Sequence, residues 1–145
     1  MSQLHSHLSK NQSQTKQIAS DLVKKMAGKG LICLYGNLGA GKTVFAKGCG
    51  SALEIPEKQI KSPSFTYVRE YRKDGKKIMY HCDFYRMDGK NEYIERMFDE
   101  LKNNDALFVI EWPSQLQMKL PTPRIDVFLE FKDENTRKIR TKKYD

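Results

Sequence analysis

The sequence has no long run of apolar residues. No segment approaches the roughly 20 apolar residues that a membrane-spanning helix needs, and the first six residues lack the apolar stretch of a signal peptide. No segment rich in proline, glycine or serine divides the 145 residues. These absences exclude a membrane span, and they predict one domain over residues 1–145 in the cytoplasm.

Cysteine is scarce, and its spacing does not suit a metal site. The three cysteines, Cys33, Cys49 and Cys82, are odd in number and widely separated, and no C-x-x-C pair is present. This excludes a disulfide framework and the usual zinc-binding pattern, although His81 precedes Cys82. We expect three small hydrophobic side chains in a reducing compartment.

Acidic residues are the minority among the charged side chains. The 18 aspartates and glutamates face 26 lysines and arginines, so the net charge is +8, which favours polyanions such as RNA, ATP or an acidic protein face as partners. The basic residues gather in two clusters, which are either solvated strand surfaces or partner-binding surfaces. The first cluster is Arg69, Arg72, Lys73, Lys76 and Lys77, and the second is Lys132, Arg137, Lys138, Arg140, Lys142 and Lys143.

A phosphate-binding motif follows the first apolar strand. The P-loop pattern G-x-x-x-x-G-K-[ST] is matched at every fixed position by Gly36, Asn37, Leu38, Gly39, Ala40, Gly41, Lys42 and Thr43. Side chains at the three glycines would block the approach of phosphate to the backbone N–H groups. Lys42 then reaches the β- and γ-phosphates, and the hydroxyl of Thr43 ligates Mg²⁺. The motif therefore predicts a site for ATP and magnesium.

The hydrophobic periodicity places this motif in an α/β fold. Helices are predicted over residues 11–27, 44–53 and 91–102, and buried strands over 31–35 and 106–110. Residues 65–71 and 77–82 form one predicted hairpin, and residues 124–131 and 136–142 form another. We expect a single-domain, P-loop NTPase-like, three-layer fold whose mixed sheet has a parallel centre and antiparallel hairpins.

Two acidic residues lie where the sheet should meet the nucleotide. Glu111 directly follows the buried strand 106–110, and Asp83 ends the strand 78–82 beside Arg86. Ligands of open α/β sheets bind at the carboxyl ends of strands, and a P-loop site needs carboxylates to hold metal and to orient water. Asp83 and Glu111 are thus candidate catalytic and magnesium-binding residues together with Lys42 and Thr43. A solvated strand end or a surface pair of Asp83 with Arg86 is the alternative.

A candidate switch segment lies between the P-loop helix and the first hairpin. Ser62 and Ser64 flank Pro63 there, at the place where segments that sense a γ-phosphate usually occur. Two hydroxyl groups around a rigid proline suit phosphate or metal sensing, and they suit an ordinary turn equally well.

The motifs together resemble the TsaE (YjeE) family of bacterial P-loop ATPases. The resemblance rests on residues 36–43, on Lys61-Ser62-Pro63-Ser64-Phe65, on the H-x-D-x-Y-R element at residues 81–86 and on Glu111-Trp112-Pro113. It implies an ATPase that is required for N6-threonylcarbamoyladenosine (t6A) at position 37 of tRNA. The implied partners are TsaD and TsaB, with tRNA reached indirectly, and ATP binding and hydrolysis reset the complex between turnovers. The implied hydrolysis is slow alone and stimulated by the partners.

The resemblance also implies roles for individual residues. Asp83 corresponds to a water-orienting or metal-linked acid, Glu111 to a second metal-linked acid, and Trp112 to a residue near the nucleotide. Thr15, in the first helix, corresponds to a threonine near the base. Two departures are Ser64, where the family usually has threonine, and residues 93–98, which lack a common glycine.

Two other functions remain open from the residues. A small P-loop kinase shares the motif, although 145 residues leave little room for a lid and an acceptor pocket. The second alternative is a nucleotide-gated binding module, in which the basic C-terminal hairpin binds RNA or a protein partner. Neither N-K-x-D nor D-x-x-G occurs, which disfavours a GTPase.

Overall fold

The computed structural model describes residues 4–63, 66–87, 92–102, 105–116 and 118–145. Its strands are β1 (Leu4–Ser9), β2 (Gly30–Tyr35), β3 (Val68–Lys73), β4 (Lys76–Asp83), β5 (Leu107–Glu111), β6 (Arg124–Phe131) and β7 (Arg137–Tyr144). Its α-helices are α1 (Gln12–Lys25), α2 (Lys42–Ala52) and α3 (Glu92–Leu101), with 3₁₀ turns η1 (Glu57–Gln59) and η2 (Pro113–Gln115). Within these ranges, none of the helices combines the length and apolar character needed to cross a bilayer.

The strands form one mixed sheet in the order β1-β7-β6-β2-β5-β4-β3. Strands β4, β5, β2 and β6 run parallel to one another, whereas β3 pairs with β4 and β7 with β6 in antiparallel hairpins. The prediction of a mixed sheet with a parallel centre is confirmed. In the register of β4 with β5, Asp83 lies opposite Glu111, so both candidate acids reach the same edge of the sheet.

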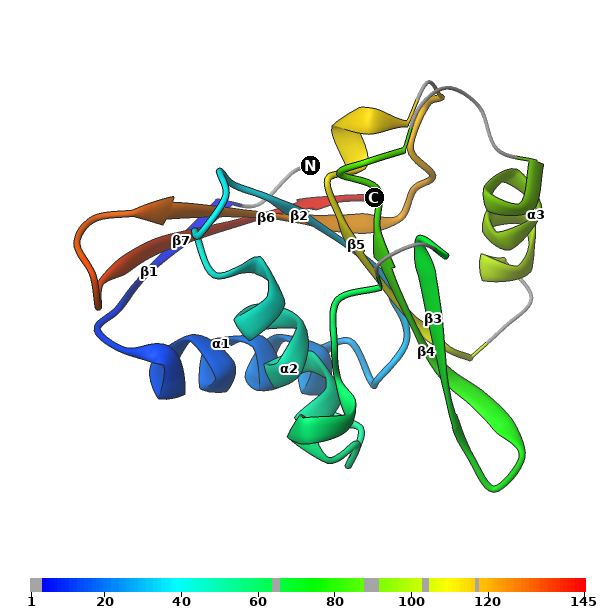
Figure 1. Cartoon of the computed structure of the whole chain (residues 1–145), viewed down its shortest axis with the longest axis horizontal. Helices are drawn as coiled ribbons and strands as arrows, with labels where there is room; N and C mark the ends of the chain where they lie inside the picture. The colour runs from blue at the N-terminus through cyan, green and yellow to red at the C-terminus, as the bar shows by residue number, and fades with distance from the viewer. Residues whose placement is uncertain (1–3, 64–65, 88–91, 103–104, 117) are drawn as a thin grey trace.

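Helices cover both faces of the sheet and complete three layers. Figure 1 shows α1 and α2 side by side, with the sheet between them and α3. One apolar core lies between the sheet and α1 with α2, around Phe45 and Ile32, and the other lies under α3, around Phe98 and Phe108. Strand β5 is buried along its whole length, as expected for a central strand with apolar residues on both faces. The three cysteines are free and buried.

The termini of several elements differ from the sequence-based expectation. Strand β5 ends at Glu111 rather than before it, so the carboxylate is the last side chain of the strand. Strand β1 was not predicted, and because it pairs with β7 it makes the sheet edge that the second hairpin was expected to form. Five of its six residues are exposed, so the strand carries no hydrophobic alternation by which to recognise it.

Candidate nucleotide site

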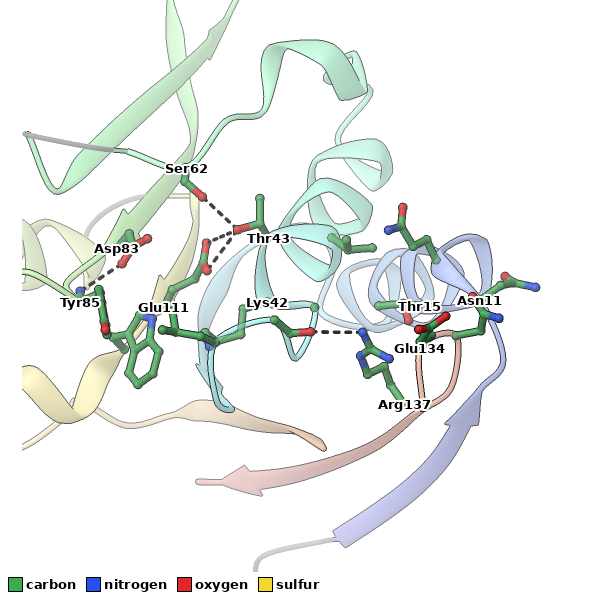
Figure 2. Close-up of a pocket in the computed structure, with 17 residues that line it drawn as sticks. Asn11, Thr15, Lys42, Thr43, Ser62, Asp83, Tyr85, Glu111, Glu134 and Arg137 are labelled. Atoms are coloured by element: carbon green, nitrogen blue, oxygen red, sulfur yellow. Dashed lines mark hydrogen bonds between the residues drawn. The ribbon is translucent and has the colours of Figure 1, made fainter. Parts of the chain in front are cut away.

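A pocket of about 550 Å³ opens where β2, β4 and β5 end and α2 begins. The volume lies within the usual range of ligand pockets, about 300–1,000 Å³. Figure 2 shows two groups of side chains around it. Thr43, Ser62, Asp83 and Glu111 gather at one end, and Asn11, Thr15, Glu134 and Arg137 lie at the other. The pocket is therefore lined by elements from nearly the whole length of the chain.

The loop between β2 and α2 has the backbone of a phosphate cradle. Gly39 and Gly41 adopt positive φ angles of 80° and 102°, which L side chains rarely adopt. A Cβ at Gly39 would meet no heavy atom within 4 Å, so the space beside the loop is open. Helix α2 starts at Lys42, so its unpaired N-terminal N–H groups lie at the end of this loop, where anions are favoured.

Lys42 lies within the pocket wall rather than in solvent. Its Nζ donates hydrogen bonds to the carbonyl oxygens of Gly36, at 2.5 Å, and Asn37, at 2.9 Å. The same ammonium stands 4.1 Å from the ring centroid of Trp112. Burial lowers the pKa of Lys42, and the carboxylates of Glu111 and Asp83 oppose that shift. The lysine is held by loop carbonyls that a phosphate group would replace as its partners.

Thr43 joins the P-loop to two other predicted site segments. Its Oγ1 lies 3.3 Å and 3.4 Å from the two carboxylate oxygens of Glu111. It is also 2.9 Å from the hydroxyl oxygen of Ser62. The structure thus brings the motif hydroxyl, the acid that ends β5 and the candidate switch segment to one point. Ser64, the other residue of that segment, lies outside the described residues.

Asp83 faces the pocket from the end of β4. Its Oδ1 accepts a hydrogen bond from the backbone N–H of Tyr85 at 3.0 Å, and a bond from Asp83 to Arg86 is not among the ion pairs of the described residues. Burial raises the pKa of Asp83, and the nearby Glu111 raises it further, against the effects of the Tyr85 N–H, His81 and Lys42. The carboxylate is therefore partly desolvated, and its burial outweighs the effect of Lys42.

The far end of the pocket contains Arg137, which was not predicted from the sequence to belong to the nucleotide site. Arg137 donates from Nε to the carbonyl oxygen of Ala40 and from Nη2 to that of Gly39, both at 3.1 Å. Asn11, Gln12, Glu134 and Asn135 line the same region. Thr15 also lines it, but the Thr15 hydroxyl is buried and bonds to Ser9 Oγ at 2.7 Å. One member of the second basic cluster, Arg137, thus belongs to the pocket.

The residues present fit a nucleotide with a divalent cation. The open glycine turn, Lys42 and the N-terminus of α2 suit phosphate groups. The hydroxyl and carboxylate oxygens of Thr43, Glu111 and Asp83 are the kind of donor that Mg²⁺ prefers. Leu38 and Trp112 line the pocket as well and supply apolar surface. The polar far end has the donors and acceptors that a base would need.

The fold and the glycine turn together define an α/β protein of the P-loop NTPase-like class. The family model of TsaE, threonylcarbamoyl adenosine biosynthesis protein, matches residues 9–139, and the chain belongs to this family. A Bacillus subtilis protein named tRNA threonylcarbamoyladenosine biosynthesis protein TsaE is 35% identical over 89% of this chain and 79% of its own length. A protein of the same name from Aquifex aeolicus is 32% identical over 90% of both chains.

A solved structure shares the fold of this chain. The crystal structure of Bacillus subtilis YdiB superimposes with a TM-score of 0.72 at 27% identity, over 100% of this chain and 88% of that chain. The family model and the two named relatives confirm the resemblance drawn from the motifs at the level of the family. The chain therefore belongs to a family that functions in tRNA threonylcarbamoyladenosine biosynthesis.

Proposed function

We propose that the protein is an ATPase that binds ATP with Mg²⁺ and serves the formation of t6A at position 37 of tRNA in the cytoplasm. The observation that carries the proposal is the meeting of Thr43, Glu111 and Ser62 at one point of the pocket. Through Thr43, this contact joins the phosphate loop to the carboxylate of Glu111 and to the candidate switch segment that contains Ser62. An arrangement of this kind suits hydrolysis that drives a conformational step.

Each residue has a role in the proposed reaction. Lys42 Nζ gives up its hydrogen bonds to the carbonyl oxygens of Gly36 and Asn37 and donates to phosphate oxygens instead. The phosphate oxygens attract the ammonium group more strongly because they carry more negative charge than a carbonyl oxygen. Thr43 and Glu111 hold Mg²⁺, which when bound neutralises charge that develops on the phosphates. Asp83 orients the attacking water or completes the metal site. Its partial desolvation keeps it responsive to a cation in the pocket.

The base is proposed to lie at the far end of the pocket. Asn11, Glu134 and Asn135 offer hydrogen-bond donors and acceptors there. Thr15 contributes part of the surface of α1 but not its hydroxyl group, because that hydroxyl is hydrogen-bonded to Ser9. Trp112, at the opposite end, lies over Lys42. In this placement the phosphates lie between Trp112 and Arg137.

We further propose that TsaD and TsaB are the partners and that hydrolysis resets their complex, with tRNA reached through that complex. ATP turnover should be slow alone, should rise with purified TsaB and TsaD, and should be lost in Lys42→Ala and Glu111→Ala. The matched control is Lys47→Ala, a lysine of α2 outside the pocket-lining residues. Transfer of the γ-phosphate to a small acceptor would instead identify a kinase.

A binding module is the second candidate, favoured by the placement of the C-terminal cations. Ile139 points into the core with α1 and α2, so Lys138 and Arg140 on either side of it point to the opposite face of the sheet. Direct RNA contact by this face would weaken steeply as salt increases. Absence of tRNA binding at low ionic strength, measured by filter retention, would exclude this second function.

A further inference from the structure

The described part of the chain contains one buried histidine beside the candidate metal site. His81 lies on β4, two residues before Asp83, and its side chain is 0% exposed. Its Nε2 is 2.6 Å from Oε2 of Glu111, which is itself buried. In the strand register Glu111 lies opposite Asp83, so His81 is its diagonal neighbour on the same face of the sheet.

The other ring nitrogen identifies the tautomer. Nδ1 of His81 is buried and has no hydrogen-bond partner among the described residues. A buried N–H group without a partner is rarer and less favourable than a buried lone pair without one. Nε2 is therefore the ring nitrogen whose N–H donates to the carboxylate oxygen of Glu111. The imidazole thus serves Glu111 as a hydrogen-bond donor.

This bond leaves the two oxygens of Glu111 unequal. Oε2 accepts from His81, while Thr43 Oγ1 lies within 3.4 Å of both oxygens. With Oε2 engaged in the core, the lone pairs of Oε1 remain on the pocket side beside Thr43. A freely rotating carboxylate would present either oxygen and would lose side-chain entropy when it bound a cation.

We propose that His81 is a positioning residue that fixes Glu111 in the orientation that binds the divalent cation. The inference rests on the proposed function and adds to it a residue that touches neither nucleotide nor metal. Hydrogen bonds from such outer residues orient metal-binding carboxylates, and their loss typically reduces metal affinity or activity about 10–100-fold. A histidine that merely filled space in the core would affect folding but not the response to metal.

The test compares three variants of the full chain. His81→Leu removes the donor at similar volume, His81→Gln keeps an amide N–H at the reach of Nε2, and His81→Asn carries an amide too short to reach Glu111. Met79→Leu, a buried change on the same strand, is the control for core perturbation. Thermal unfolding monitored by circular dichroism establishes that each variant folds.

Two titrations with Mg²⁺ then decide the role. The first measures ATP turnover with the partner proteins, and the second measures ATP binding by equilibrium dialysis with and without Mg²⁺. The leucine and asparagine variants should raise the half-maximal Mg²⁺ concentration about 10–100-fold. The glutamine variant should have a half-maximal concentration close to that of the wild type. Binding of ATP without Mg²⁺ should stay within about twofold, because no contact with the phosphates is lost.

The outcomes separate the two proposals. If Leu, Asn and Gln lower stability or the maximal rate alike and leave the Mg²⁺ midpoint unchanged, His81 is a structural core residue and the inference is wrong. If the wild type does not hydrolyse ATP, the proposed function fails, while the dialysis series still tests whether His81 sets the Mg²⁺ dependence of binding. If the leucine variant does not fold, the comparison of Gln with Asn answers the same question.

Discussion

Arg137 offers the sharpest test of how the C-terminal hairpin supports the phosphate loop. Its guanidinium bonds to the carbonyl oxygens of Gly39 and Ala40, and it lies 4.6 Å from the ring of Phe131. Both carbonyls belong to the loop between β2 and α2, which is the proposed phosphate cradle. By holding them, Arg137 would keep the loop in one conformation before the proposed nucleotide binds.

The structure sets the size of the effect. A hydrogen bond of this kind contributes about 1 kcal/mol net, so the two bonds to the loop contribute about 2 kcal/mol of ordering. If all of this ordering favours binding, Arg137→Met should weaken ATP affinity about 30-fold. Arg137→Lys keeps the charge but reaches one carbonyl at a time, so it should lose about 1 kcal/mol, or about fivefold.

Isothermal titration with ATP and Mg²⁺ measures both variants against Arg140→Met. Arg140 is exposed on the same strand and does not line the pocket, so this control should bind as the wild type does. Full recovery of affinity in Arg137→Lys would refute the reasoning, because the effect would then come from charge rather than from the two carbonyl bonds. Unchanged affinity in a folded Arg137→Met would refute it as well.

Three further predictions follow from the same pocket. ATP with Mg²⁺ should change the emission of Trp112, because Lys42 must leave its position 4.1 Å from the ring, and Lys42→Met should abolish the change in a fluorescence titration. Gly36→Ala should lower the free energy of unfolding by about 1–3 kcal/mol in urea, because a Cβ there would approach the backbone oxygen of Leu129 to 2.7 Å. Asp83→Asn should raise thermal stability at pH 7, because burial raises the pKa of Asp83 in the folded state and the ionised carboxylate is therefore unfavourable there. The same change should abolish ATP turnover, because it removes the proposed catalytic carboxylate. That stabilisation should shrink as the pH falls through the raised pKa of folded Asp83, and it should vanish below the ordinary aspartate value of 3.8, where the carboxyl is protonated in the folded and unfolded states alike. A gain that persists at low pH would contradict this cause.

The sequence predicts those parts of the site that depend on residues close together in the chain. The glycine spacing requires one kind of turn, and Asp83 and Glu111 directly end apolar strands, so parallel pairing alone brings them to one edge. The continuous apolar composition of β5 identifies it as central. Local sequence was sufficient because each of these features follows from a few neighbouring residues.

The parts that it does not predict depend on long-range contacts. Arg137 lies 97 residues from Ala40 and sits within a run of cations, so nothing nearby distinguishes the one that meets the loop. His81 is part of a recognisable motif, but only the pairing of β4 with β5 shows that it bonds Glu111 rather than a metal with Cys82. Strand β1 is exposed at the sheet edge, so its pairing with β7 leaves no mark on its composition.

Thr43 explains how occupancy of the pocket would reach the segment that contains Ser62. A hydroxyl group has one proton and two lone pairs. If Thr43 donates to Glu111, the bond to Ser62 uses a lone pair of Thr43 as its acceptor. A cation on Thr43 Oγ1 needs a lone pair as well, and it repels a proton donated from Ser62. Binding of the proposed cation with ATP would therefore weaken the Ser62 contact, and release of phosphate and cation would restore it, so that hydrolysis would alternately free and fasten the segment between α2 and β3.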